Sequence, residues 1–244
     1  MIRLAIVLDP FALLRESRRG KEPDPVACTH LAALAGADQI TIHLRSDRRH
    51  IQDRDLELLR QTAPIPLNLR ISTHSDMVTI ACEKKPDLTT LVPERQEEVA
   101  VGSGLDAVLH QDSIRRATLG LAESGLAVNL LVEPEIEQLK AATRAGCGGV
   151  EIYTGRFGRA LDARTRENEL SRIGEAARAG RVLELRVTAG GGLSFEDAAA
   201  VARIEEIETI HVGHSLAARA ALVGLDRAIR DLKNLMEAAR RRNS

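Results

Sequence analysis

Eight short apolar runs rich in β-branched residues recur along the chain, and segments with helical periodicity separate them. The runs cover residues 4–9, 39–44, 65–71, 88–92, 126–132, 148–153, 184–189 and 208–213. Between two of them, in segment 134–145, Ile136, Leu139 and Ala142 share one helical face. Strand alternating with helix is typical of parallel strands joined by crossover helices. Eight such units favour a closed barrel over an open, doubly wound sheet.

The length of the chain agrees with a closed barrel. Its 244 residues are close to the roughly 250 that are typical of a (β/α)8 barrel. We therefore predict an α/β protein in which residues 1–244 form a single (β/α)8 TIM barrel domain with extra helical or loop segments. Segments 10–23 and 93–108 exceed a minimal connection, and the second is either a lid over the barrel mouth or a solvated loop.

The composition argues against several classes of partner. Lysine and arginine total 34 against 35 acidic residues, and the aromatic residues are one tyrosine and three phenylalanines. Balanced charge and few stacking side chains do not suit nucleic-acid binding, and no apolar run is long enough to span a membrane. Cys28, Cys82 and Cys147 form no C-x-x-C pair. We expect a cytoplasmic protein that contacts neither nucleic acid nor membrane.

The residues after the last two expected strands suggest a phosphate site. Gly190, Gly191 and Gly192 precede Ser194, which can cap a helix, and Gly213 runs into a further helix. In (β/α)8 barrels the loops after strands seven and eight frequently bind phosphate, because glycine lets backbone N–H groups approach the anion closely. The alternative is that these glycines only turn the chain.

Polar residues also follow the second and sixth expected strands. Strand alternation places His43 and Arg45 on one face, where both can point into the barrel mouth. His43 could be a general acid or base and Arg45 an anion clamp, although a lone histidine is more often structural. Glu151 could stabilise a cation or simply pair with an arginine. His211 and His214 resemble a metal pair, but no further ligands complete a site, and we expect no metal.

Short motifs in a fixed order cover nearly the whole chain. They are LD at 8–9, LRESR at 14–18, PDPV at 23–26, HLRSDRRHIQDRD at 43–55, LVPE at 91–94, GLD at 104–106, EIYTG at 151–155, AGGGL at 189–193 and VGHSL at 212–216. In these motifs the chain resembles the pyridoxine 5'-phosphate synthase family of vitamin B6 biosynthesis. The resemblance implies a barrel that condenses 1-deoxy-D-xylulose 5-phosphate with 3-amino-2-oxopropyl phosphate, releasing phosphate and water, without metal or organic cofactor. It also implies a homo-oligomer, which is an octamer in the family.

The resemblance also implies roles for individual residues. His43 corresponds to a general acid or base, and Glu151 to a residue that stabilises the transition state. Arg18 corresponds to an arginine that crosses between subunits. The remaining matches bind substrate: Asp9, Arg45 and His50 contact the sugar phosphate, and Gly192, Gly213 and His214 surround the second phosphate.

Five positions depart from the family pattern. Arg70 stands in place of a catalytic glutamate, and Gly191 in place of a catalytic histidine. Val7, Pro10 and Ala100 replace an asparagine, a histidine and a threonine. Because arginine stays protonated and glycine has no side chain, neither can take over proton transfer. Each lost acid or base typically lowers the rate about a hundred- to ten-thousand-fold.

Two functions therefore remain open. The first is an enzyme that binds phosphorylated small molecules and forms pyridoxine 5'-phosphate or a different product. The second is a non-catalytic paralogue that binds a phosphorylated ligand or assembles with an active homologue. Arg70 either binds an added anionic group of the ligand, with Gly191 opening space, or pairs with Glu151 and closes the site.

Overall fold

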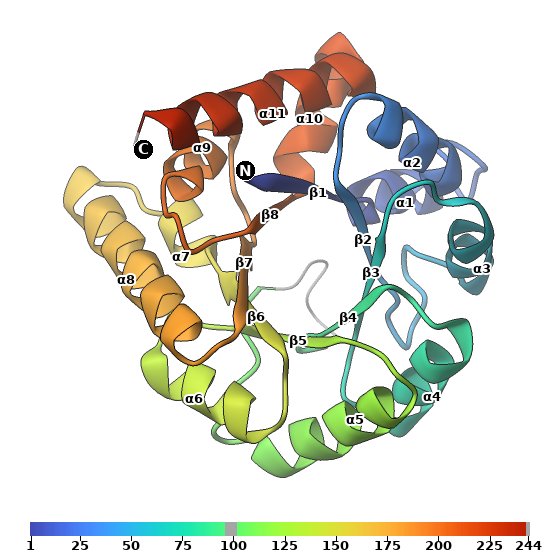
Figure 1. Cartoon of the computed structure of the whole chain (residues 1–244). Coiled ribbons are helices and arrows are strands. Elements are labelled where there is room, and N and C mark those ends of the chain that lie inside the picture. Colours follow the sequence, from blue (N-terminus) through green and yellow to red (C-terminus); the bar gives the residue numbers. More distant parts are fainter. Residues whose placement is uncertain (96–101, 243–244) are drawn as a thin grey trace.

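The computed structural model describes residues 1–95 and 102–242, and its strands close into a parallel barrel (Figure 1). Strand β8 pairs with β1 to complete the circle. The strands are β1 (Arg3–Val7), β2 (Gln39–His43), β3 (Leu67–Ile71), β4 (Leu88–Leu91), β5 (Val128–Val132), β6 (Gly149–Tyr153), β7 (Arg186–Gly190) and β8 (Thr209–Val212). Each apolar run of the sequence is a strand, with small differences at the ends. The predicted (β/α)8 barrel is confirmed.

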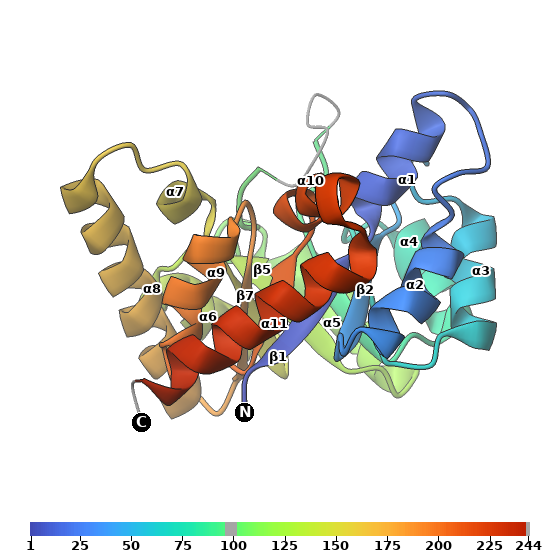
Figure 2. The same cartoon turned by 90° about the horizontal axis from the view of Figure 1, so that it is seen from above.

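Helices surround the strands on the outside of the barrel (Figure 1). They are α1 (Asp9–Glu16), α2 (Pro25–Leu34), α3 (Asp53–Thr62), α4 (Ser75–Lys84), α5 (Gln111–Glu123), α6 (Ile136–Arg144), α7 (Gly155–Gly158), α8 (Ala163–Val182), α9 (Phe195–Ala202), α10 (His214–Val223) and α11 (Leu225–Arg241). Figure 2 shows α1, α7 and α10 at the end toward which the strands run. These helices therefore border the mouth of the barrel, where barrel enzymes have their active sites.

The two long connections differ in how much of them is described. Segment 10–23 contains most of α1, whose first turn holds Pro10, a position that suits proline because the first helical N–H groups need no intrahelical partner. Segment 93–108 includes residues 96–101, and Ala100 with them, which lie outside the described residues. Within its described part, Leu105 N donates to Leu131 O at 2.8 Å, so this part runs along the end of β5.

Strand alternation separates the buried residues into two layers. Outward side chains such as Ile42, Leu69 and Val150 belong to one apolar core with the helices. The inward side chains are largely polar, and Thr41, Asn68 and Thr90 are fully buried among them. Two residues of the predicted face of α6, Leu139 and Ala142, are buried, but Ile136 is 46% exposed because it begins the helix and lies beyond the contact with the sheet.

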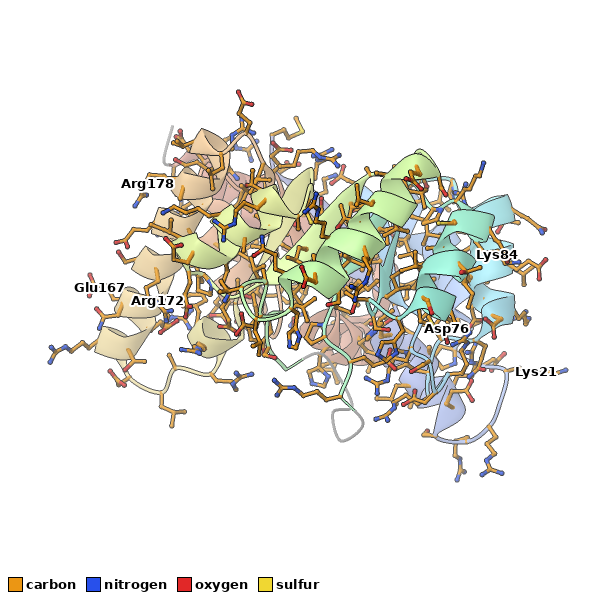
Figure 3. All side chains as sticks on the ribbon, turned by 90° about the horizontal axis from the view of Figure 1, so that it is seen from below. Lys21, Asp76, Lys84, Glu167, Arg172 and Arg178 are labelled. Carbon is orange, nitrogen blue, oxygen red and sulfur yellow. The ribbon has the colours of Figure 1, made fainter. Side chains whose placement is uncertain are left out.

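The outer surface of the helices carries charges of both signs (Figure 3). Glu167, Arg172 and Arg178 project from α8, and Asp76 and Lys84 from α4. Of the helices that the structure describes, none is both long enough and apolar enough to cross a membrane.

A buried ion pair holds α1 against the loop that follows β2. Arg15 Nη1 and Nη2 donate to Asp55 Oδ1 and Oδ2 at 2.8 and 2.7 Å, and Nη2 also donates to His50 O at 3.0 Å. Asp55 Oδ2 in turn accepts from Gln52 N at 2.9 Å, which closes the first turn of α3. Arg15 therefore positions the chain segment that contains His50.

Replacing Arg15 tests this anchor. Removal of one partner leaves the other charge buried and unpaired, so Arg15→Met should lower the free energy of unfolding by about 3 kcal/mol or more. Urea denaturation provides the measurement. Arg227→Met removes an arginine that pairs with Asp231 on the exposed face of α11 and should change stability little; equal losses in the two variants would contradict a structural role for Arg15.

Candidate active site

A cavity of about 340 Å³ opens at the mouth of the barrel. This volume is within the range of small-molecule sites. The cavity brings together residues from the ends of six strands and from the loops after them. Its lining consists of Val7, Asp9, Pro10, Arg70, Leu131, Glu151, Tyr153, residues 190–194, His211 and residues 213–215.

Two glycine-containing loops form one wall of the cavity. Gly191 and Gly192 have φ values of +106° and +71°, a region that glycine adopts without strain. Ser194 Oγ accepts from Asp197 N at 3.1 Å and caps α9, as predicted. Helix α10 begins directly after Gly213, and Ser215 Oγ donates to Leu193 O at 2.6 Å, which joins the two loops. Backbone N–H groups at the start of a helix suit a phosphate group.

Arg70 and Glu151 form an ion pair across the barrel mouth. Arg70 Nη2 donates to Glu151 Oε1, and the two side chains are 9% and 1% exposed. Of the two possibilities that the sequence leaves open for Arg70, the structure shows the pairing with Glu151. The pair does not satisfy all of its polar atoms, because Arg70 Nε and Glu151 Oε2 are buried without a hydrogen-bond partner among the described residues.

His43, Arg45 and His50 lie together beside this ion pair and are each only 2% exposed. The backbone N of His43 donates to Asp9 Oδ1 at 2.8 Å, and the His43 and His50 rings are 5.9 Å apart. Arg45 Nε and Nη2 donate to Asp47 at 3.1 and 3.0 Å. Burial, together with the nearby His50, Arg70 and Arg45, lowers the pKa of His43 well below its ordinary value. His43 is therefore a neutral imidazole at neutral pH.

The cluster of Asp9, His43 and His50 has the composition of a metal site, and one ligand atom from each lies within 4.8 Å of the others. Its hydrogen bonds do not fit a metal. His50 Nδ1 accepts from Ile51 N at 2.8 Å, so the neutral ring carries its proton on Nε2, whereas a metal-bound histidine donates from its second nitrogen to an acceptor. With Arg45 beside it, His50 Nε2–H instead suits an anionic ligand.

Arg18 does not lie at the mouth of its own barrel. It is exposed and borders a groove of α1 and α2 with Leu14, Pro23 and Leu31. The other predicted binding residues, Gly192, Gly213 and His214, line the cavity together with Asp9.

Three of the replaced positions, Val7, Pro10 and Gly191, lie in close contacts in the wall of the cavity. A Cβ atom on Gly213 would lie 2.9 Å from Val7 Cβ and 3.4 Å from Pro10 Cγ, so Val7 and Pro10 close that side of the cavity with apolar atoms. A Cβ atom on Gly191 would lie 2.6 Å from two carbons of the Tyr153 ring. The expectation that Gly191 opens space is therefore wrong, because Tyr153 fills it.

The sequence interpretation missed His211 as a residue of the cavity. Its Nδ1 lies 3.1 Å from Thr41 Oγ1, and its Nε2 is buried without a partner among the described residues. Gly190 permits this arrangement, since a Cβ atom there would lie 2.6 Å from Glu151 Oε1 and 2.8 Å from His211 Cβ. Alternation along residues 208–213 already places His211 on the inward face, and that signal alone could have identified it.

The fold and the cavity define a class of protein: a (β/α)8 barrel whose mouth joins glycine-rich loops to buried histidines and an ion pair. Comparison with known proteins is more specific. The family model described as "Pyridoxal phosphate biosynthesis protein PdxJ" matches residues 4–238, and the chain belongs to this family.

Relatives of similar length support the assignment. The chain is 48% identical over 237 residues to the pyridoxine 5'-phosphate synthase of Geotalea daltonii, covering 97% of this chain and 99% of that protein. It is 47% identical over 236 residues to the enzyme of the same name from a Synechococcus strain, covering 97% and 99% of the two chains. Among solved structures, 3-keto-L-gulonate-6-phosphate decarboxylase from Vibrio cholerae superposes with a TM-score of 0.63 at 17% identity, over 97% of this chain and 98% of that one. The last likeness shows the fold alone.

The packing of Tyr153 over Gly191 can be tested by a double-mutant cycle. Gly191→Ala should destabilise the protein both through the positive φ, by about 1–2 kcal/mol, and through the contact with the Tyr153 ring. In a Tyr153→Ala background, Gly191→Ala should lower the free energy of unfolding only by the part that comes from the positive φ, as measured by urea denaturation. Equal costs in both backgrounds would show that the ring moves aside freely.

Burial of His211 predicts a pH dependence of stability. Burial, opposed by the carboxylate of Glu151 and reinforced by the guanidinium of Arg70, lowers the pKa of His211 from 6.5 to about 4. Between these values the unfolded chain binds more protons, so the free energy of unfolding falls by about 1.4 kcal/mol per pH unit as the pH drops from 6.5 toward 4.

His211→Gln removes this titration. Between about pH 7 and pH 5 the variant should lose roughly 2 kcal/mol less stability than the unchanged protein, as measured by urea denaturation at both pH values. The buried His43 contributes to both proteins and cancels in the comparison. Parallel losses would mean that folding does not lower the pKa of His211.

Proposed function

We propose that this protein is a pyridoxine 5'-phosphate synthase that condenses two phosphorylated small molecules at the mouth of its barrel. Its family membership and its identity of nearly one half with enzymes of that name support the proposal. One structural observation carries it: His43, Arg70, Glu151 and His211 each present a buried polar atom without a hydrogen-bond partner among the described residues. Buried polar atoms are normally satisfied, so a polar ligand is expected between them.

The substrates are those that the family resemblance implies, 1-deoxy-D-xylulose 5-phosphate and 3-amino-2-oxopropyl phosphate. The phosphate of one would lie in the loops of Gly192, Gly213 and His214, which line the cavity at the start of α10. The phosphate of the other would be held by Arg45 and His50, with Asp9 between the two ends. His43 would exchange protons with the substrate.

The Arg70–Glu151 pair constrains the mechanism. Glu151 can stabilise a cationic intermediate only if the substrate draws it away from Arg70 or shares it, because a carboxylate already neutralised by arginine stabilises a second cation weakly. Breaking this buried pair costs energy, which binding of the two phosphate groups has to supply. We therefore expect slow turnover relative to a barrel in which Glu151 is unpaired.

We further propose that residues 1–244 form one domain, which assembles with copies of itself. Leu14 and Leu31, which border the groove of Arg18, are 61% and 49% exposed, and an apolar surface next to an arginine suits a subunit contact.

The three cysteines are free thiols, which agrees with a cytoplasmic location.

Purified protein with both substrates tests the proposed function. We expect pyridoxine 5'-phosphate to form and His43→Gln to lower kcat by about a hundredfold or more. Saturation with 1-deoxy-D-xylulose 5-phosphate, at about 100 times its Kd, should raise Tm by roughly 5 °C or more. A raised Tm without product would favour the phosphate-binding paralogue, and neither product nor a raised Tm would reject the proposal.

Arg70→Met tests whether the Arg70–Glu151 ion pair limits turnover. Removing the arginine leaves Glu151 unpaired, so the variant should be less stable toward urea, yet its kcat should rise if the ion pair limits turnover. Val7→Leu, which alters the cavity wall without touching the pair, serves as the matched control. A fall in kcat with Arg70→Met would show that the ion pair does not limit turnover and that the contact of Arg70 with substrate outweighs its hold on Glu151.

A further inference from the structure

His211 offers the cavity a polar atom to which the family resemblance assigns no role. The side chain points inward from β8, lines the cavity beside Arg70 and Glu151, and is 2% exposed. Its Nε2 atom has no hydrogen-bond partner in the described residues. A buried polar atom without a partner is costly, and a ligand atom that reaches it removes this cost.

A chain of hydrogen bonds across the barrel interior determines which nitrogen of His211 carries the proton. Thr90 Oγ1 donates to Asn68 Oδ1 at 2.9 Å, which orients the amide. Asn68 Nδ2 then donates to Thr41 Oγ1 at 3.5 Å. Thr41 Oγ1 accepts from Asn68, and its own hydrogen is available for His211 Nδ1, 3.1 Å away. With the Thr41 hydroxyl as the donor, Nδ1 accepts and the proton of the neutral ring is on Nε2.

The groups around His211 keep the ring neutral. Burial disfavours the imidazolium, and the charges that act on the ring are the guanidinium of Arg70 on β3 and the carboxylate of Glu151 on β6. These two charges are themselves paired. The third neighbour, Thr41 on β2, is uncharged. His211 is thus a fixed, neutral hydrogen-bond donor directed at the cavity, rather than a group that exchanges protons near neutral pH.

We propose that His211 Nε2–H donates a hydrogen bond to the carbonyl oxygen of a phosphorylated ketone bound in the cavity, and polarises that carbonyl group. This inference rests on the proposed function. The neighbouring unpartnered atoms complete the recognition of such a ligand, because Arg70 Nε–H is a second donor and Glu151 Oε2 accepts from a hydroxyl or amino group. The site therefore selects hydroxyketone or aminoketone phosphates over phosphates of simple alcohols.

This donor would lower the reaction barrier because it lies where negative charge develops. When a ketone enolises or its carbonyl carbon is attacked, charge grows on the oxygen, and a preorganised donor in a buried site stabilises it. A neutral imidazole performs this task in other barrel enzymes. His211 transfers no proton and so does not replace the acid or base lost at Arg70 and Gly191.

Three variants separate the donor from the bulk of the side chain. His211→Leu removes the donor at similar volume, whereas His211→Gln keeps an N–H at nearly the same place without a titrating group. Ser72→Ala is the matched control, because Ser72 Oγ is also buried and unpartnered but does not line the cavity. We expect kcat/KM to fall roughly 100- to 1,000-fold in His211→Leu. In His211→Gln most of the lost kcat/KM should return, and in Ser72→Ala kcat/KM should not change.

Infrared spectroscopy tests the contact without turnover. The carbonyl stretch of 1-deoxy-D-xylulose 5-phosphate, labelled with 13C at C2, should move to lower wavenumber on binding to the unchanged protein and to His211→Gln, but not to His211→Leu. If the unchanged protein does not bind the ligand, the proposed function fails and this inference falls with it. If the ligand binds and the stretch is the same in His211→Leu, only the role of His211 is overturned.

Nitrogen NMR of 15N-histidine-labelled protein tests the tautomer in the free protein, with His211 assigned by the signal lost in His211→Gln. We expect the proton on Nε2 throughout the range from about pH 6 to pH 8. Thr41→Val should allow the Nδ1–H form to appear. A proton on Nδ1 in the unchanged protein, or a charged ring at neutral pH, would overturn the proposal even if His211→Leu is inactive or fails to fold.

Discussion

Closure of the sheet is the constraint on which the site depends. When eight parallel strands form a barrel, the inward side chains of opposite strands must meet in a space that water hardly reaches. Polar groups there have to satisfy one another, and Arg70 of β3 and Glu151 of β6 do so with an ion pair across the mouth. A lone buried arginine or glutamate would be far more costly than the pair. The same closure brings Thr90, Asn68, Thr41 and His211 from four strands into one chain of hydrogen bonds.

Two of the replaced positions, Arg70 and Gly191, are each matched to a neighbouring residue, so that each forms a coupled pair rather than a separate loss. Arg70 is tolerated because Glu151 neutralises it, and Gly191 leaves room for the ring of Tyr153 that occupies the adjacent space. Restoring one residue of either pair would therefore disturb its partner. The proposed phosphate site in the glycine loops, in contrast, would depend on backbone N–H groups and so on chain conformation rather than on any one side chain.

Local rules account for much of the fold and for part of the site. The strands and the Ser194 cap follow from alternation and helix-capping preferences, and both are present; His43 and Arg45 are buried, and their direction into the mouth stays a prediction. The buried face of α6 is predicted too widely, since Ile136 lies beyond the sheet contact. The contact of Arg15 with Asp55, forty positions apart in the sequence, has no local signature. The same is true of Tyr153 over Gly191, because neither periodicity nor composition reports which rotamer fills a space.

The sequence by itself determined the barrel and the family, because strand period and motif order are properties of neighbouring residues. Only the tertiary structure decided what the residues of the site do to one another: that Arg70 is paired, that the hydrogen bonds of His50 suit an anion rather than a metal, and that His211 lines the cavity beside Arg70 and Glu151. These outcomes depend on distances between strands and loops that are remote in the chain. Ångström-scale geometry in a buried, poorly solvated space determines charge state and hydrogen-bond direction, and no local pattern encodes it.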